Sequence, residues 1–159
     1  MLAYLQGLSL GLAYVAPIGV QNLFVINAGL SQPRAAAYRT ALIVIFFDVT
    51  LALAGFFGIG ALIEHSELIR KGVLLAGSLV VMYMGLRLML SREVAGPAIN
   101  VNIPLMKTIG MACVVTWFNP QAIIDVSLLL GSFRVALPPE ESGLFLWGVV
   151  CASCLWFLS

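Results

Sequence analysis

Apolar residues run along this chain in five long stretches, and polar residues collect in the short segments between them. The stretches cover residues 7–30, 41–63, 72–90, 108–133 and 143–159. About 20 helical residues cross the ~30 Å hydrocarbon core of a bilayer, so these stretches have the length of membrane spans. The connections are short and contain turn formers. The pattern predicts an all-α integral membrane protein, a bundle of five transmembrane helices in one domain, 1–159.

Composition and charge agree with this class. Of the 159 residues, 62% are hydrophobic and 9% charged, with a mean hydropathy of +1.07. The net charge of +1, without a cluster of Lys or Arg, argues against a nucleic-acid partner. The N-terminus lacks the basic region of a signal peptide, so we expect the first stretch to stay in the membrane. The basic residues near the span ends favour an external N-terminus by five (Arg34, Arg39, Arg87, Arg92, Lys107) to three (Arg70, Lys71, Arg134).

Two acids lie inside the apolar stretches. Asp48 is in "VIFFDVTLAL" and Asp125 is in "NPQAIIDVSLLL". A carboxylate at the bilayer centre costs roughly 2.5–3.5 kcal/mol on insertion scales and usually faces a pathway. We therefore expect both acids to lie on a substrate or ion pathway, with hydrogen-bonded ties between helices as the alternative.

Helix breaks are predicted beside these polar positions. Asn119 and Pro120 have the preferences of an N-cap and a first helical residue, although they lie in the middle of a stretch. Pro17 removes a backbone hydrogen bond in the first stretch, where Gln21 and Asn22 can satisfy the freed groups or a ligand. A half-helix that starts inside the membrane directs N–H groups and a positive dipole into a cavity, which suits a carboxylate.

The two breaks also suggest an internal repeat. Asn22 and Asp125 each follow a break proline, Pro17 and Pro120, by five residues. Repeats of three helices would enter the membrane in opposite senses, and interrupted helices in corresponding halves point to a transporter's central site. We predict a three-plus-three inverted repeat that lacks its sixth helix, with a first copy over about 1–92 and an incomplete second over about 104–159.

The motifs "PIGVQNLFV", "FFDV" and "TWFNPQAIIDVSLLLGS" resemble the lysine exporter (LysE) superfamily, in particular its bacterial arginine exporter branch. This resemblance implies secondary active export of arginine or lysine across the bacterial inner membrane, driven by the membrane potential or a proton gradient. Family members carry a sixth hydrophobic segment, so we expect a C-terminal segment to be missing here. The positions that match the family's motifs are Pro17, Gln21, Asn22, Asp48, Asn119, Pro120 and Asp125.

Other functions are less well supported by the residues. Within transporters, the substrate could be a neutral amino acid such as homoserine or threonine, with the acids carrying protons. A thiol-disulfide electron carrier needs reactive cysteines beside the breaks, whereas Cys151 and Cys154 form "CASC" in the last stretch, where small residues favour helix packing. An intramembrane aspartyl protease would use Asp48 and Asp125 as a dyad, but no glycine closely precedes either. We expect no enzyme activity, no cofactor and no metal, and the sequence leaves homo-oligomerisation open.

Overall fold

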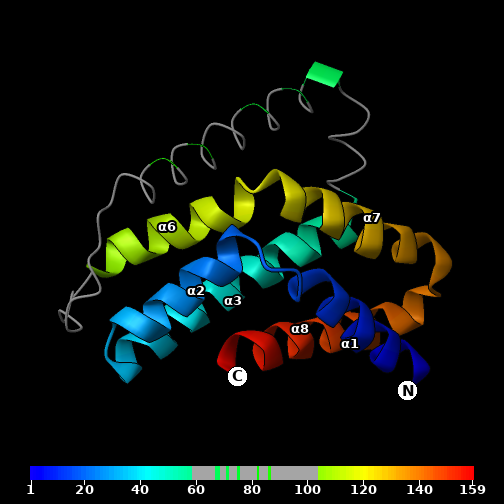
Figure 1. Cartoon of the computed structure of the whole chain (residues 1–159). Coiled ribbons are helices and arrows are strands. Elements are labelled where there is room, and N and C mark those ends of the chain that lie inside the picture. The colour runs from blue at the N-terminus through cyan, green and yellow to red at the C-terminus, as the bar shows by residue number, and fades with distance from the viewer. Residues whose placement is uncertain (59–66, 69–70, 72–74, 76–81, 83–85, 87–103) are drawn as a thin grey trace.

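The computed structural model describes residues 1–58, 67–68, 71, 75, 82, 86 and 104–159 (Figure 1). Within these residues the chain is helical and contains no strand. The helices are α1 (Leu2–Val15), α2 (Val20–Ser31), α3 (Arg34–Phe56), α6 (Leu105–Trp117), α7 (Pro120–Ala136) and α8 (Ser142–Leu158), with the short 3-10 helix η1 (Pro139–Glu141) before α8. The all-α prediction is confirmed for this part of the chain.

The first apolar stretch forms two helices instead of one continuous span. α1 and α2 meet at an angle of 79° across the break at residues 16–19. Pro17 cannot donate a backbone hydrogen bond, and Gly19 adopts extended backbone angles as the N-cap of α2. The break predicted around Pro17 is confirmed, but α2 begins three residues after the proline.

The second predicted stretch starts earlier than its apolar pattern. α3 begins at Arg34, directly after Pro33, because Ala35, Ala36 and Ala37 are strong helix formers and Pro33 is well suited to a helix start. The connection between the first two predicted stretches therefore ends at Pro33. The stretch predicted over 72–90 is described only at residues 75, 82 and 86, and Arg87 lies outside the described residues.

The fourth stretch is also divided, at the place the sequence indicates. Helix α6 ends at Trp117, and α7 begins at Pro120 after a bend of 57°. Asn119 is the N-cap of α7, and its side-chain oxygen accepts a hydrogen bond of 3.2 Å from the Gln121 backbone N–H. The predicted helix start at Asn119 and Pro120 is confirmed.

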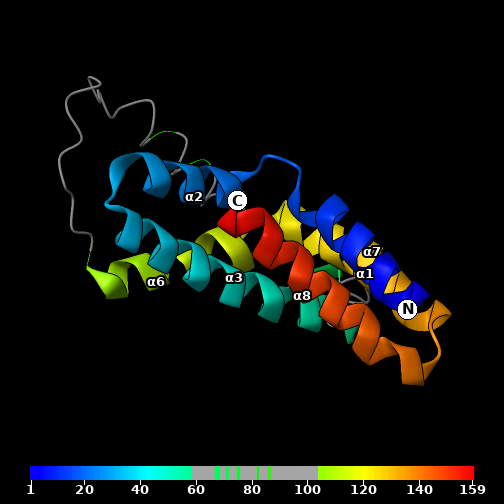
Figure 2. The same cartoon turned by 90° about the horizontal axis from the view of Figure 1, so that it is seen from below.

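Helices α1 and α8 form the closest helix pair. They run in the same direction through the bundle, and their backbones meet at glycines (Figures 1 and 2). A Cβ at Gly7 would collide with the Phe145 carbonyl, and one at Gly148 would collide with the Tyr4 carbonyl. A Cβ at Gly11 would lie 2.7 Å from that of Ala152. The pair matches the small-residue packing by which membrane helices approach one another.

Helix α3 is at the centre of the bundle. It packs against α2, α6, α7 and α8, and its core residues include Val44, Leu51 and Phe56. Two helical segments, Arg34–Phe56 and Pro139–Leu158, are long and apolar enough to span a membrane alone. Each bent pair, α1–α2 and α6–α7, also qualifies if it counts as one span, which makes up to four spans in the described chain. The architecture is a helical membrane bundle with two broken elements.

Candidate substrate site between two broken helices

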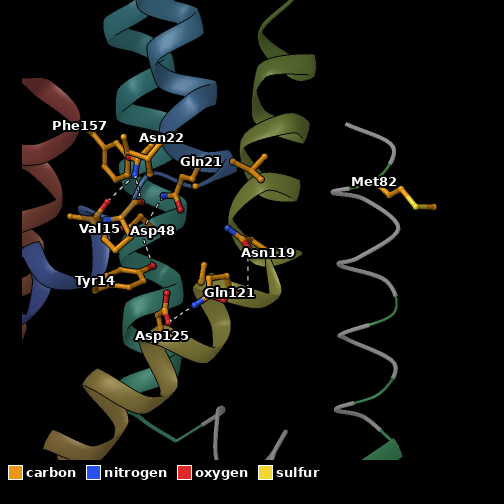
Figure 3. A pocket seen from close by; sticks show the side chains of 15 residues that line it. Tyr14, Val15, Gln21, Asn22, Asp48, Met82, Asn119, Gln121, Asp125 and Phe157 are labelled. Carbon is orange, nitrogen blue, oxygen red and sulfur yellow. Dashed lines mark hydrogen bonds between the residues drawn. The ribbon is translucent and has the colours of Figure 1, made fainter. Parts of the chain in front are cut away.

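A cavity of about 500 Å³ lies where the two breaks face each other (Figure 3). Its walls come from α1, α2, α3, α7 and α8, from the break at residues 16–19, and from Met82. Most of the lining is apolar, with a few polar groups directed inward. This size and composition are typical of a site for one small molecule, since such sites occupy roughly 300–1,000 Å³.

Asp48 lies on one wall of the cavity and is almost completely buried, with 1% of its surface exposed. Its Oδ1 accepts hydrogen bonds from the Tyr14 hydroxyl at 2.8 Å and from the Gln21 amide at 3.1 Å. Its Oδ2 accepts one from the Ser153 hydroxyl at 2.6 Å. The three donors come from α1, α2 and α8, so this carboxylate joins three helices to the central one. Figure 3 shows the donors from α1 and α2 beside Asp48.

Asn22 stabilises the first break. Its amide nitrogen donates to the carbonyl oxygens of Val15, at 3.0 Å, and Pro17, at 2.7 Å. These acceptors lie at the end of α1 and in the break. The Asn22 side-chain oxygen accepts a hydrogen bond of 3.0 Å from the Trp156 indole. The expectation that Asn22 satisfies freed backbone groups is confirmed, and it also fastens the break to α8.

The start of α2 supplies free donors to the cavity. The backbone N–H groups of Val20, Gln21 and Asn22 belong to its first turn and have no acceptor among the described residues. Asn119 from the second break is adjacent, since its amide nitrogen lies 3.9 Å from the position that a Gly19 Cβ would take. Unsatisfied N–H groups at a helix start normally need an acceptor, and an anion can meet the need of these three.

Asp125 occupies a different part of the same cavity. Its Oδ1 accepts a hydrogen bond of 2.8 Å from the Gln121 amide one turn earlier on α7. The side chain is only half-buried, and no cation pairs with it within the described part of the chain. Asp125 is therefore the accessible acid of the site, whereas Asp48 is enclosed.

The structure brings six of the seven residues predicted from sequence to the cavity wall: Pro17, Gln21, Asn22, Asp48, Asn119 and Asp125. Pro120 occupies the first position of α7, between Asn119 and Gln121. Residues about 100 positions apart along the chain are thus assembled around one space.

Four residues that contribute to the site were missed by the sequence analysis: Tyr14, Ser153, Trp156 and Phe157. Tyr14 could have been noted from the sequence, because it places a hydroxyl group three residues before Pro17. Ser153 was attributed to helix packing because it lies within "CASC". Gln121 was quoted only as part of a motif, although its side-chain amide donates to Asp125.

None of the three cysteines is among the residues that line the cavity. Cys113, Cys151 and Cys154 are free thiols, each half-buried. The close helix approach expected from "CASC" is confirmed at Ala152, which is fully buried against Gly11. The arrangement gives no support to thiol-disulfide chemistry at the cavity.

A helical membrane bundle with a small central cavity between two interrupted helices defines the class of membrane translocators. The sequence profile of the family described as "LysE type translocator" matches residues 12–159. The chain belongs to this family and is a multi-pass protein of the bacterial inner membrane.

Relatives cover nearly the whole chain. It is 32% identical to the arginine exporter protein ArgO of Serratia proteamaculans (strain 568), across 98% of this chain and 77% of the relative. The protein of the same name from Pectobacterium atrosepticum is 31% identical, across 98% and 78%. The one from Escherichia coli (strain K12) is 33% identical, across 97% and 74%. No solved structure matches the chain significantly.

Proposed function

We propose that this protein exports basic amino acids, arginine or lysine, by secondary active transport across the inner membrane. The observation that carries the proposal is one cavity that holds free helix N–H groups at one place and an accessible carboxylate at another. A cationic amino acid carries the two complementary charges. The names of the relatives, arginine exporters, support the same substrate class.

The substrate carboxylate binds at the start of α2. There the backbone N–H groups of Val20, Gln21 and Asn22 and the positive end of the helix dipole are free to hold an anion. At α7, Pro120 has no N–H and the Gln121 N–H already binds Asn119. The second break therefore contributes mainly the Asn119 amide and its dipole.

The cationic side chain binds Asp125. Asp125 follows Asn119 by six residues on α7, which is about 9 Å along a helix. Extended arginine spans about 9 Å from carboxylate to guanidinium, given ordinary bond lengths. One molecule can therefore reach both positions. Guanidinium and carboxylate groups also form charge-assisted paired hydrogen bonds, which the free oxygen of Asp125 allows.

Asp48 has a different role in this scheme. With three donors on its two oxygens, it has little capacity left for a substrate group. It fixes α1, α2 and α8 around the cavity. The pathway role predicted for both acids is thus divided between holding the site and binding the cation.

We also propose a single transporter domain with five spans and inverted repeats, in which α1–α2 corresponds to α6–α7 and α3 corresponds to α8. The support comes from the directions in which the corresponding helices run. Asp48 contacts Ser153 while Phe56 stacks on Phe145, so α3 and α8 run in opposite directions. Figures 1 and 2 show that α2 and α7, which correspond in this scheme, run in opposite directions as well. Both broken pairs carry their bend beside the cavity.

The test is efflux of labelled arginine and lysine from exporter-deficient cells that express the chain, with its amount in the inner membrane measured. Gly19→Ala is the sharpest variant, because its methyl would enter the carboxylate position at 3.9 Å from Asn119 without a collision. The matched control is Gly29→Ala on the same helix, where a Cβ meets nothing within 4 Å. We expect about tenfold weaker apparent arginine affinity for Gly19→Ala only, because a lost charged hydrogen bond is worth about 1.5 kcal/mol or more.

The possible results separate the proposals. Export of threonine or homoserine instead of arginine and lysine, by protein present in the membrane, would overturn the substrate class. Equal arginine affinity in Gly19→Ala and Gly29→Ala would overturn the carboxylate position at α2 and leave the substrate class intact.

A further inference from the structure

Three phenylalanine rings form a layer at one end of the bundle. Phe56 ends α3, Phe133 lies in the last turn of α7, and Phe145 lies in the first turn of α8. The Phe145 ring stacks on Phe56 at 5.5 Å and on Phe133 at 5.6 Å between centroids. Phe56 and Phe145 are fully buried. The aromatic layer therefore closes the space between these three helices.

This layer lies in line with the substrate site. Phe56 follows Asp48 by eight residues on α3, and Phe145 precedes Ser153 by eight residues on α8. Both offsets correspond to about 12 Å along a helix. Because Asp48 and Ser153 are hydrogen-bonded to each other, the two helices place the aromatic layer at the same depth beyond the site.

A guanidinium group covers the outer side of the layer. The Cζ atom of Arg134 lies 5.6 Å from the centroid of Phe56 and 5.9 Å from that of Phe57. The two rings are nearly perpendicular, at 86°, and form two walls of a corner. In the part of the chain that the structure describes, no carboxylate pairs with Arg134. Aromatic faces, instead of an acid, hold this cation, within the usual 6 Å of a cation–π contact.

We propose that Phe56 and Phe57 form a second cation-binding site on the transport route, occupied by Arg134 while that end is closed. The inference rests on the proposed export of basic amino acids. Arg134 and arginine end in the same guanidinium group, so a ring corner that binds one binds the other. A leaving substrate displaces Arg134 from the rings and opens the aromatic layer, and Arg134 returns afterwards.

A simpler role for Arg134 makes different predictions. A cation in the last turn of α7 is favourable to the helix dipole on its own. In that case the ring of Phe57, which is 64% exposed, has no part in transport. Phe46 lies on α3, the helix that Phe57 caps, and is also 64% exposed, but no cation lies over it in the described part of the chain. Phe46→Leu is therefore the matched control for Phe57→Leu.

The experiment measures entry of external labelled arginine into de-energised cells, which reports leakage, and the ratio of arginine to lysine export in energised cells. We expect Phe57→Leu and Arg134→Gln each to raise leakage about two- to fivefold, the range that one cation–π contact supports. The double variant should leak no more than either single variant, because both remove the same contact. Arg134→Lys should leak less than Arg134→Gln.

Phe57→Leu should also lower the arginine-to-lysine ratio, because the flat guanidinium stacks on aromatic faces better than an ammonium does. Phe57→Leu behaving like Phe46→Leu in both measurements would overturn the second site, as would additive leakage in the double variant. Wild-type protein that exports neither amino acid would instead overturn the proposed function itself.

Discussion

Asp48 and Asp125 are both acids within apolar stretches, and the structure places them in very different surroundings. Asp48 is 1% exposed and accepts three hydrogen bonds, from residues 34, 27 and 105 positions away in the chain. Asp125 is half-buried and accepts one, from a residue four positions away on its own helix. One acid is held by the whole fold and the other by a single turn of helix.

The difference teaches that an intramembrane acid can have its hydrogen bonds supplied by the surrounding helices, or can keep an oxygen available for a ligand. A buried carboxylate needs its acceptor positions satisfied, and three helices do this for Asp48. Asp125 keeps an oxygen for a partner that moves in and out. Variants at the two positions should therefore fail in different ways.

Asp48→Asn should have the largest effect. The amide keeps one oxygen for Tyr14 and Gln21, and the Ser153 hydroxyl can accept from the new NH₂ group while it donates to Val149. The protein should therefore insert in normal amount, but export should fall about 30-fold or more, since removing a buried charged partner costs about 2 kcal/mol or more. Efflux of labelled arginine per membrane-inserted molecule measures this. Wild-type export would show that a neutral amide at position 48 holds the three helices around the cavity as well as the carboxylate does.

Asp125→Asn should have the next largest effect, and this effect should be confined to substrate affinity. The Gln121 contact survives, because the amide keeps an acceptor oxygen, but the charge that holds the cation is lost. We expect about tenfold weaker apparent affinity for arginine and lysine, in line with about 1.5 kcal/mol for a charged hydrogen bond. Concentration-dependent efflux measures it, with the exposed acid variant Glu140→Gln as control. Equal affinity in both variants would remove Asp125 from the binding site.

Ser153→Ala should have an intermediate effect. It removes one of three donors to Asp48 and leaves a fully buried carboxylate oxygen without that partner. Unfolding should become easier by about 1–3 kcal/mol, and Ser153→Thr should retain the donor. Thermal aggregation in detergent measures the change, with Ser142→Ala at the start of the same helix, away from Asp48, as control. Equal stability of Ser153→Ala and Ser142→Ala would show that Tyr14 and Gln21 suffice.

Trp156→Phe should have the smallest effect of the series. It deletes the indole N–H that donates to Asn22 but retains an aromatic ring at a position that is 38% exposed. Because Asn22 keeps both contacts to the break, we expect a loss of about 0.5–1.5 kcal/mol in stability and export within about threefold of wild type. Trp147→Phe, at 65% exposure, is the control. A loss of stability as large as that of Ser153→Ala would show that the Trp156 hydrogen bond is needed to hold Asn22 at the break.

Sequence reasoning performed best where a local rule applied. Asn119 and Pro120 begin α7 because capping and proline preferences act within one turn, and the same logic located the break near Pro17. It was less accurate for the start of α3, because Arg34, Arg39 and Thr40 end the apolar stretch while the alanines between them continue the helix.

The partners of Asp48 could not be predicted in the same way. Ser153 lies 105 residues away, and a serine between two cysteines has no local feature that distinguishes a hydrogen-bond donor from a packing residue. The unequal exposure of Asp48 and Asp125 also depends on which helices surround them. Periodicity and residue type identified both acids, but only the packing separates their roles.

The close pairing of α1 with α8 has a consequence for how the protein is made. The glycine contacts join the first helix of the chain to the last one described, and Trp156 reaches Asn22 across 134 residues. During synthesis, α1 enters the membrane before α8 has been made. Until then the glycine face of α1 has no α8 to pack against. The site around Asp48 is completed only after residues 142–158 have been inserted. A ribosome that stalls before Ser142 would thus leave a membrane-bound chain whose first helix remains open to quality-control proteases.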